Sequence, residues 1–481
     1  MNEEGTSKKI WIILGVVILL LIIGVGVFFV MTKNKAATGG IKGVGSLFGF
    51  IGAEVPRPIG GDIHAGSSTS NGYTPGGGSS DEPLFRQLST VQAAGATSVT
   101  HDGQTFVRYI ARENGFVYEV DPMSGVSKQL TNTTVPRIYE AYWGNAGNSV
   151  VIRYLFKDPL TKQDIIRTEI GDLVLPIASS TTELGSLEGL TDRLPDNISG
   201  VSVSPNGKFL LYLLPVSDGV SGTVVALESR NAREVLRNSF SEWLPQMLDS
   251  GHIILTTKPS WDVPGFSYLY NTNNRTLSRL VREKNGLTTL GNSAGKRMLY
   301  NENVSGNTVL SMYDEKGFAD EDSQITHTAP LQLATLPEKC AWSGNGVRIF
   351  CAAFADTAQN HIPDDWYQGT VSLHDTFWTI DTNSSDLVYL ADPQKEVGHN
   401  FDVLSPFIGG NEKHLFFINK NDFTVWSMRL QKEKYESATE AASVTGGTKQ
   451  PELTPEEMKD AAGSVSTNTP VSTTVQPKKP K

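Results

Sequence analysis

The chain has 481 residues, 46 of them glycine and 24 proline, and its formal net charge is −10. This charge, without any long cluster of Lys and Arg, argues against a broad nucleic-acid-binding surface. The chain has only two cysteines, Cys340 and Cys351, which rules out a disulfide-rich miniprotein and a C-x-x-C zinc site. Its length suits one large domain or two or three ordinary ones.

The first element in chain order follows a short tail, residues 1–9, and is a run of 22 uncharged residues from Ile10 to Met31, IWIILGVVILLLIIGVGVFFVM. As a helix, this run is long enough to cross a bilayer core of about 30 Å. It exceeds the apolar core of a cleavable signal peptide, which has about 7–15 residues, so it predicts an uncleaved anchor that crosses the membrane once. Lysines flank both ends, so the positive-inside rule does not decide the orientation. A short tail before the helix and a large domain after it favour a cytoplasmic N-terminus and an extracytoplasmic domain.

Two polar segments flank the rest of the chain. Residues 32–83 are rich in Gly, Ser and Pro, and residues 431–481 form a polar tail that ends in QPKKPK. Neither segment can bury enough apolar surface to fold alone. We therefore expect a flexible linker and a disordered C-terminal tail.

Residues 84–430 contain a repeated pattern, in which a polar turn that ends in Gly is followed by a strand of alternating apolar residues. Successive turn glycines are 44, 60, 44, 44, 51 and 64 residues apart. Three equal spacings in the low forties, with short strands between turns, are typical of propeller blades. The seven turn glycines are Gly103, Gly147, Gly207, Gly251, Gly295, Gly346 and Gly410.

The two ends of this region complement each other. The seventh repeat stops after FTVWSMRL without a fourth strand, whereas the region opens with the isolated strand-like segment LFRQLSTVQ, residues 84–92. We expect this segment to complete the seventh blade, because closure of the ring leaves no open edge on either terminal blade. The predicted fold is an all-β, seven-bladed β-propeller, with six or eight blades as the alternatives.

The third repeat contains SVSPNGKFLLYL, and the sixth contains AWSGNGVRIF, which keeps a Trp-Ser before the turn. These stretches resemble the blade motif of bacterial WD-repeat-like propellers of the TolB type, in which a Ser-Pro-Asp-Gly turn precedes an apolar strand. The resemblance covers about residues 84–430 and implies the propeller fold. It does not assign a function, because propellers host enzymes, ligand sensors and scaffolds alike.

A G-x-S-x-G match, Gly291-Asn-Ser-Ala-Gly295, raises the question of a serine hydrolase. A nucleophile elbow requires a helix after the turn, but KRMLYNEN follows Gly295 and has the pattern of a strand. The match also occupies the turn position of the fifth repeat. We therefore interpret Ser293 as an ordinary turn residue.

The most unusual connection joins the second and third strands of the sixth repeat, residues 355–374, and carries IPDDWYQG. In propellers this connection lies on the face that usually carries ligands, together with KDPLTKQD and KPSWDVPG of the second and fourth repeats. Aromatic rings beside carboxylates suit recognition of a protein or a glycan, whereas burial of the rings as a plug is an equally good interpretation. A metal site is a weaker alternative, since no known ligand spacing matches. The candidate binding residues are His361, Asp364, Asp365, Trp366 and Tyr367; His374 ends the segment and Asp375 follows it.

The two cysteines are expected on neighbouring strands. If Trp342 lies opposite Ile349 across the turn SGNGVR, then Cys340 lies directly opposite Cys351. Directly opposed residues can form a disulfide with a small adjustment, and an exported domain permits one. Two buried free thiols are the equal alternative.

These patterns together predict a membrane-anchored, extracytoplasmic propeller that binds or scaffolds another macromolecule of the cell envelope, a protein or a glycan. No P-loop, dinucleotide fingerprint or EF-hand loop is present, so no cofactor and no metal is predicted. The alternative is a propeller hydrolase or lyase acting on glycans or peptides. An enzyme should place converging acidic, His or Arg side chains around the central channel, whereas a scaffold should present an aromatic surface of low charge.

Overall fold

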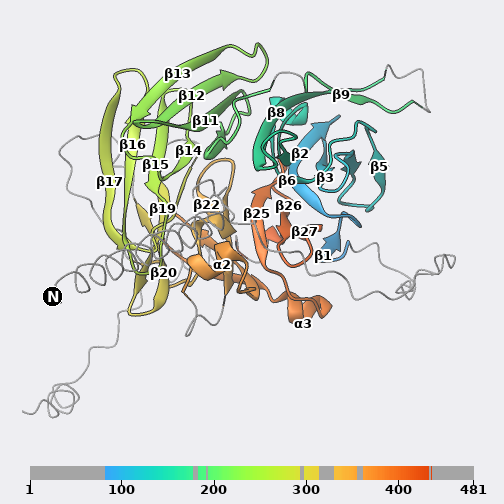
Figure 1. The fold of residues 1–481 in the computed structure, drawn as a ribbon. Coiled ribbons are helices and arrows are strands. Elements are labelled where there is room, and N and C mark those ends of the chain that lie inside the picture. The colour runs from blue at the N-terminus through green and yellow to red at the C-terminus, as the bar shows by residue number, and fades with distance from the viewer. Residues whose placement is uncertain are drawn as a thin grey trace, which may run out of the picture. The chain divides into compact units, whose positions relative to one another are not determined.

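The computed structural model describes residues 82–176, 183–190, 193–292, 297–313, 330–354, 361–432 and 435. Their strands form seven antiparallel sheets, and the fold is an all-β, seven-bladed propeller (Figure 1). Blade one contains β2 (Ala93–His101), β3 (Gln104–Ala111), β4 (Val117–Val120) and β5 (Ser127–Gln129). Blade two contains β6 (Ile138–Gly144), β7 (Ser149–Lys157), β8 (Asp164–Val174) and β9 (Ser186–Glu188). Blade three contains β10 (Gly200–Val203), β11 (Phe209–Val216), β12 (Gly219–Ala226) and β13 (Ala232–Asn238).

The remaining blades follow in chain order. Among the described residues blade five has three strands and each other blade has four. Blade four contains β14 (Trp243–Met247), β15 (His252–Thr257), β16 (Pro264–Asn271) and β17 (Thr276–Asn285), and blade five contains β18 (Thr289–Gly291), β19 (Met298–Val304) and β20 (Asn307–Tyr313). Blade six contains β21 (Cys340–Trp342), β22 (Arg348–Phe354), β23 (Asp375–Asp381) and β24 (Leu387–Ala391). Blade seven contains β25 (Val403–Ile408), β26 (His414–Asn419), β27 (Val425–Arg429) and β1 (Phe85–Gln87). Short helices are η1 (Asn145–Gly147), η3 (Pro337–Lys339), α2 (Asp364–Gln368) and α3 (Pro393–Val397).

The first strand closes the ring, as the sequence predicts. Strand β1 pairs antiparallel with β27, with Phe85 opposite Met428, and Figure 1 shows blue β1 beside orange β27. The Phe85 side chain is buried, and its ring centre lies 5.4 Å from that of Phe377 and 5.5 Å from that of Phe401. The closing strand is therefore fixed both by its ladder and by packing against blades six and seven.

Apolar side chains pack between neighbouring blades. One cluster joins Ile110 of blade one to Ile138 and Ile152 of blade two, and another joins Leu211 of blade three to Leu255 of blade four. Each sheet therefore buries both faces, which explains why its strands carry apolar residues in alternation and also in short continuous runs.

Polar contacts also cross from blade to blade around the ring. In each, a side chain of one blade reaches the backbone or a side chain of the next. The pairs are Arg108 to the carbonyl of Gly147, Arg153 to the carbonyl of Ile198, Ser202 to the amide of Met247, Gln246 to Gly291, Thr288 to Glu338, and Lys339 to Asp402.

Several of the predicted turn glycines, which lie between the first and second strands of a blade, have a positive φ. Gly103, Gly147, Gly207 and Gly346 have φ values of 77°, 85°, 68° and 70°. In blade seven, Glu412 instead takes this conformation, with φ 52°. A turn that needs a positive φ thus accounts for glycine at these four positions without any catalytic role.

The segment with Ser293 joins two antiparallel strands. Gly291 of β18 lies opposite Met298 of β19, so a strand follows the G-x-S-x-G match, where a nucleophile elbow would need a helix. Ser293 itself lies outside the described residues, which resume at Arg297.

The expected membrane anchor at residues 10–31, the linker up to residue 81, and residues 436–481 of the tail also lie outside the described residues. Within the part of the chain that the structure describes, no helix is long and apolar enough to cross a membrane.

Candidate functional site: the central cavity

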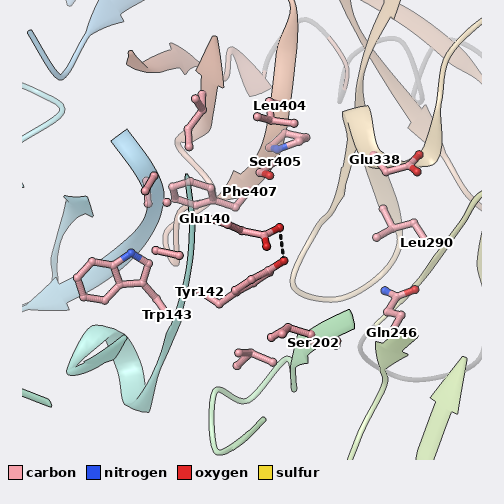
Figure 2. Close-up of a pocket in the computed structure, with 18 of the residues that line it drawn as sticks. Glu140, Tyr142, Trp143, Ser202, Gln246, Leu290, Glu338, Leu404, Ser405 and Phe407 are labelled. Carbon is pink, nitrogen blue, oxygen red and sulfur yellow. Dashed lines mark hydrogen bonds between the residues drawn. The ribbon is translucent and has the colours of Figure 1, made fainter. Parts of the chain in front are cut away.

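The inner strands of all seven blades, β2, β6, β10, β14, β18, β21 and β25, line a central cavity of about 530 Å³ (Figure 2). Much of its wall is apolar, with Leu244, Leu290, Leu404 and Phe407 among the lining side chains. The volume lies within the range of about 300–1,000 Å³ that is usual for small-ligand pockets. The cavity can therefore hold a small molecule or a short piece of a larger one.

Several polar side chains of the wall are already used to join blades. Gln246 accepts a 2.8 Å hydrogen bond from the amide of Gly291, and Ser202 accepts one of 2.9 Å from the amide of Met247. Glu338 accepts hydrogen bonds from the hydroxyls of Thr288, at 2.7 Å, and Tyr367. Burial raises the pKa of Glu338, although these hydrogen bonds oppose the rise.

A second carboxylate, Glu140, is held in a buried ion pair. Its Oε2 lies 2.5 Å from Nη1 of Arg153, and its Oε1 accepts a 2.5 Å hydrogen bond from the Tyr142 hydroxyl, drawn as a dashed line in Figure 2. Burial and the neighbouring Glu140 raise the pKa of the Tyr142 hydroxyl well above its usual value. Both Glu140 oxygens are occupied, so this carboxylate is poorly placed to act as a general base toward a ligand.

Arg112 is the third charged residue of the wall. It follows β3 in the loop to β4, where its amide donates to the carbonyl of Gln92 and its carbonyl accepts from the amide of Ile138. Its guanidinium carbon lies 4.1 Å from the ring centre of Phe423, and no acceptor among the described residues forms a hydrogen bond with the guanidinium. Burial lowers the pKa of Arg112 to about 10, and Glu140 opposes this shift.

The cysteine pair lies at the edge of this cavity. Cys340, a lining residue, is opposite Cys351 and Trp342 is opposite Ile349, which is the predicted register. The two sulfur atoms are 2.11 Å apart and form a disulfide. The bridge joins the inner two strands of blade six.

The long connection of blade six contains α2 after residues 355–360, which lie outside the described residues. The Trp366 side chain is 0% exposed, and its Nε1 donates a 2.8 Å hydrogen bond to Asp402. Tyr367 is half-buried and donates to Glu338 of the cavity wall. Both rings pack in a cluster with apolar residues of blades one, six and seven, which favours the interpretation of the two rings as a plug.

Trp366 covers a buried group of charges. Lys339 is fully buried, and its ammonium lies 2.6 Å from an Asp375 oxygen and 2.7 Å from an Asp402 oxygen. Burial alone would lower the pKa of Lys339, but the two carboxylates outweigh it and raise the pKa. Lys420 donates to the Trp366 carbonyl at 2.7 Å, and burial lowers its pKa to about 8. The network ties α2 to the strands beneath it.

The acidic and imidazole groups of the predicted set lie toward the surface. Asp364 accepts a 2.5 Å hydrogen bond from the amide of Trp261, in the corresponding loop of blade four, and the Trp261 ring stacks on His361 with centres 4.1 Å apart. The two loops therefore lie on the same face, as predicted. Asp365 binds the amide of His361 at 2.8 Å. Within the described ranges no group of three or more His, Cys, Asp and Glu side chains is arranged to hold a metal ion.

Sequence reasoning did not identify the residues that converge on the cavity. Arg112 and Phe423 belong to the second-to-third-strand loops of blades one and seven, and neither ARENG nor NDFTV differs visibly from an ordinary polar loop. Ser405 lines the cavity at a bulge of β25, with φ 49°. In the sequence, only the Ser-Pro pair after Leu404 marks the position of this bulge.

No protein-family model and no curated protein sequence matches the chain. Among solved structures, the chain is similar to the β-propeller domain of Cps50 (Swd1) from Myceliophteria thermophila, at 12% identity and a TM-score of 0.45 over 72% of this chain and 100% of that one. It is also similar to an oligogalacturonate lyase in complex with manganese, at 10% identity and a TM-score of 0.44, and to an oligogalacturonate lyase from Vibrio parahaemolyticus, at 10% identity and a TM-score of 0.46. Each lyase alignment covers 73% of this chain and 94% of the other.

Proposed function

We propose that the propeller is a non-catalytic binding module, which holds a segment of another cell-envelope macromolecule in its central cavity. The observation that carries this proposal is the state of the charged groups in the cavity wall. Glu140 is paired with Arg153, and Glu338 accepts two hydroxyl hydrogen bonds. Much of the remaining wall is apolar or aromatic, which suits binding by burial of apolar surface.

The enzyme alternative needs a group that can transfer a proton or stabilise charge on a bound substrate. Among the described residues that line the cavity, two are carboxylates, both hydrogen-bonded, and none is a histidine. Arg112 is the one charged lining group without a hydrogen bond to another described residue, and a single guanidinium supports binding of an anion better than it supports a complete reaction.

The expected anchor gives the proposal its location. An uncharged run at residues 10–31, followed by a Gly/Ser/Pro-rich linker, supports a single-pass protein with a cytoplasmic N-terminus and an extracytoplasmic propeller. The linker would let the propeller reach a partner at some distance from the bilayer. The TolB-type resemblance of the blade motif is compatible with such an envelope protein.

The test compares a variant that fills the cavity with one that changes the outer surface. Ala96 is a partly exposed lining residue on β2, and Ala232 is exposed on β13, the outermost strand of blade three. The full-length chain, Ala96→Trp and Ala232→Trp are each immobilised and exposed to a detergent extract of the source cells. Retained material is then identified by mass spectrometry.

We expect one set of molecules to bind the unchanged chain and Ala232→Trp, to be lost with Ala96→Trp, and to be recovered chemically intact. Equal retention by Ala96→Trp would refute binding in the cavity. Conversion of a retained peptide or glycan into fragments by the unchanged chain would replace the proposal with the enzyme alternative.

A further inference from the structure

The side chain of Arg112 lies in the cavity wall with no partner for its hydrogen-bond donors among the described residues, although its backbone is fixed on both sides. The amide donates to Gln92 at 2.8 Å, and the carbonyl accepts from Ile138 at 3.0 Å. The guanidinium carbon lies over the Phe423 ring, 4.1 Å from its centre, so a cation–π contact holds the charged end of the side chain at this ring. A guanidinium fixed in this way, with its donors unused, can bind a planar acceptor such as a carboxylate through two parallel hydrogen bonds.

The charge balance around Arg112 favours an anion. The carboxylate of Glu140 attracts the Arg112 guanidinium, but its charge already faces Arg153 at 2.5 Å and its second oxygen accepts from Tyr142. Glu140 is thus shared by two guanidinium groups, and the other carboxylate among the described lining residues, Glu338, already accepts from the hydroxyls of Thr288 and Tyr367. A ligand that brings one negative charge would balance the group in a partly desolvated site, where charge pairing is stronger than in water.

Two hydroxyls of the same wall also lack a hydrogen bond within the described part of the chain. The Tyr139 hydroxyl is buried without a partner, and Ser405 is exposed at the bulge where β25 shifts register against β26. A buried hydroxyl without a partner is unfavourable, and an exposed serine beside the cavity can donate to a bound oxygen. Blades one and seven thus each contribute an accessible polar group that is not used within the fold, Arg112 and Ser405, and blade two contributes a buried one, Tyr139.

We propose that Arg112 forms a carboxylate-binding subsite in the central cavity, and that the occupant is an acidic peptide segment. The shared chemistry, a carboxylate, could also come from an acidic sugar. The rest of the wall favours the peptide, because Leu244, Leu290, Leu404 and Phe407 can pack against apolar side chains. A glycan would require many free hydrogen-bonding groups, and Gln246 and Ser202 are engaged between blades.

This inference rests on the proposed binding function and names the chemistry of its ligand. The probes are N-acetylleucine, its neutral amide and digalacturonate, each titrated into the full-length chain in detergent by isothermal calorimetry or ligand-observed NMR. Arg112→Met removes the charge and keeps the length of the side chain, Arg112→Lys keeps the charge without the bidentate geometry, and Arg279→Met removes an exposed arginine of β17 as the matched control.

We expect the acid to bind at least about tenfold more tightly than the amide, as for a charge-assisted hydrogen bond. Arg112→Met should remove this preference, Arg112→Lys should retain part of it, and Arg279→Met should leave it unchanged. Circular dichroism of each variant verifies the fold, and intermediate binding by the Lys variant supports the subsite even if the Met variant is unfolded.

Equal binding of acid and amide, or an unchanged preference in a folded Arg112→Met variant, would overturn the subsite. Tighter binding of digalacturonate than of N-acetylleucine would overturn the peptide assignment. These results are distinguishable from failure of the proposed function, because loss of partner retention in Ala96→Trp would still support a binding cavity. Retention by Ala96→Trp equal to that of the unchanged chain would contradict the binding cavity itself.

Discussion

Replacement of Trp366 with alanine tests whether α2 is part of the core. The side chain is fully buried, it packs with apolar residues of blades one, six and seven, and its Nε1 donates to the charged Asp402. Removal of a large buried aromatic side chain costs about 3–5 kcal/mol, and a hydrogen bond to a charged group contributes about 1.5–3 kcal/mol. Because the two terms overlap, we expect Trp366→Ala to lower the free energy of unfolding by about 4–6 kcal/mol.

Two further variants separate the contributions. Trp366→Phe keeps an aromatic ring and removes the N–H donor, so its loss should be about 2 kcal/mol. Trp261→Ala removes the half-buried ring that stacks on His361 at the surface, and it should cost about 1 kcal/mol. Denaturant unfolding of the full-length chain, followed by circular dichroism, gives all three values.

The reasoning would be refuted if Trp366→Ala unfolded within about 1 kcal/mol of the unchanged chain. If the same variant were stable but bound a partner at least about 2 kcal/mol more weakly, Trp366 would instead belong to a binding surface, as the sequence alone allowed.

Other consequences of the structure can be measured directly. A chain that begins at residue 93 should aggregate or melt well below one that begins at residue 80, because it leaves the edge of β27 unpaired; equal melting temperatures would contradict closure by β1. Alkylation of unfolded, unreduced protein should leave Cys340 and Cys351 unmodified, and modification of both would show that the bridge is absent. Burial lowers the pKa of Lys420 to about 8, whereas an unfolded lysine titrates near 10.4, so between about pH 8 and 10 the unfolded chain binds the extra proton and stability due to this residue rises with pH. The difference in unfolding free energy between the unchanged chain and Lys420→Met should therefore increase across that window, and a constant difference would argue against a desolvated ammonium.

Much of the fold could be predicted because its signals are local. The turn before a second strand is short and favours a residue with positive φ. Glycines such as Gly103 and Gly207 have this conformation and therefore recur at the blade period. The isolated segment around Phe85 predicted closure because an open blade edge is unfavourable, and strand pairing across one short turn was enough to place Cys340 opposite Cys351.

The cavity could not be predicted in the same way, since its polar groups come from different blades. Arg112 contacts Phe423 of the last blade, and Glu140 pairs with Arg153 one strand further along. No period or spacing encodes which inner-strand residues face a common cavity, because that depends on the tilt of every blade. The long connection of blade six shows the same limit. Its aromatic residues were identified, but only the position of Asp402 decides that Trp366 is buried.

The pairing of β1 with β27 also imposes an order on biosynthesis. Arg86 and its partner Ser427 are separated by 341 positions. At about 5–20 residues per second, the ribosome needs about 17–70 s to make the partner after the first strand has been completed. Throughout this interval β1 has no edge to pair with, so the earliest strand of the ring is the last to join it. A nascent chain that ends prematurely within blade seven would therefore leave exposed strands at both ends of the ring, and a late truncation should be nearly as damaging as an early one.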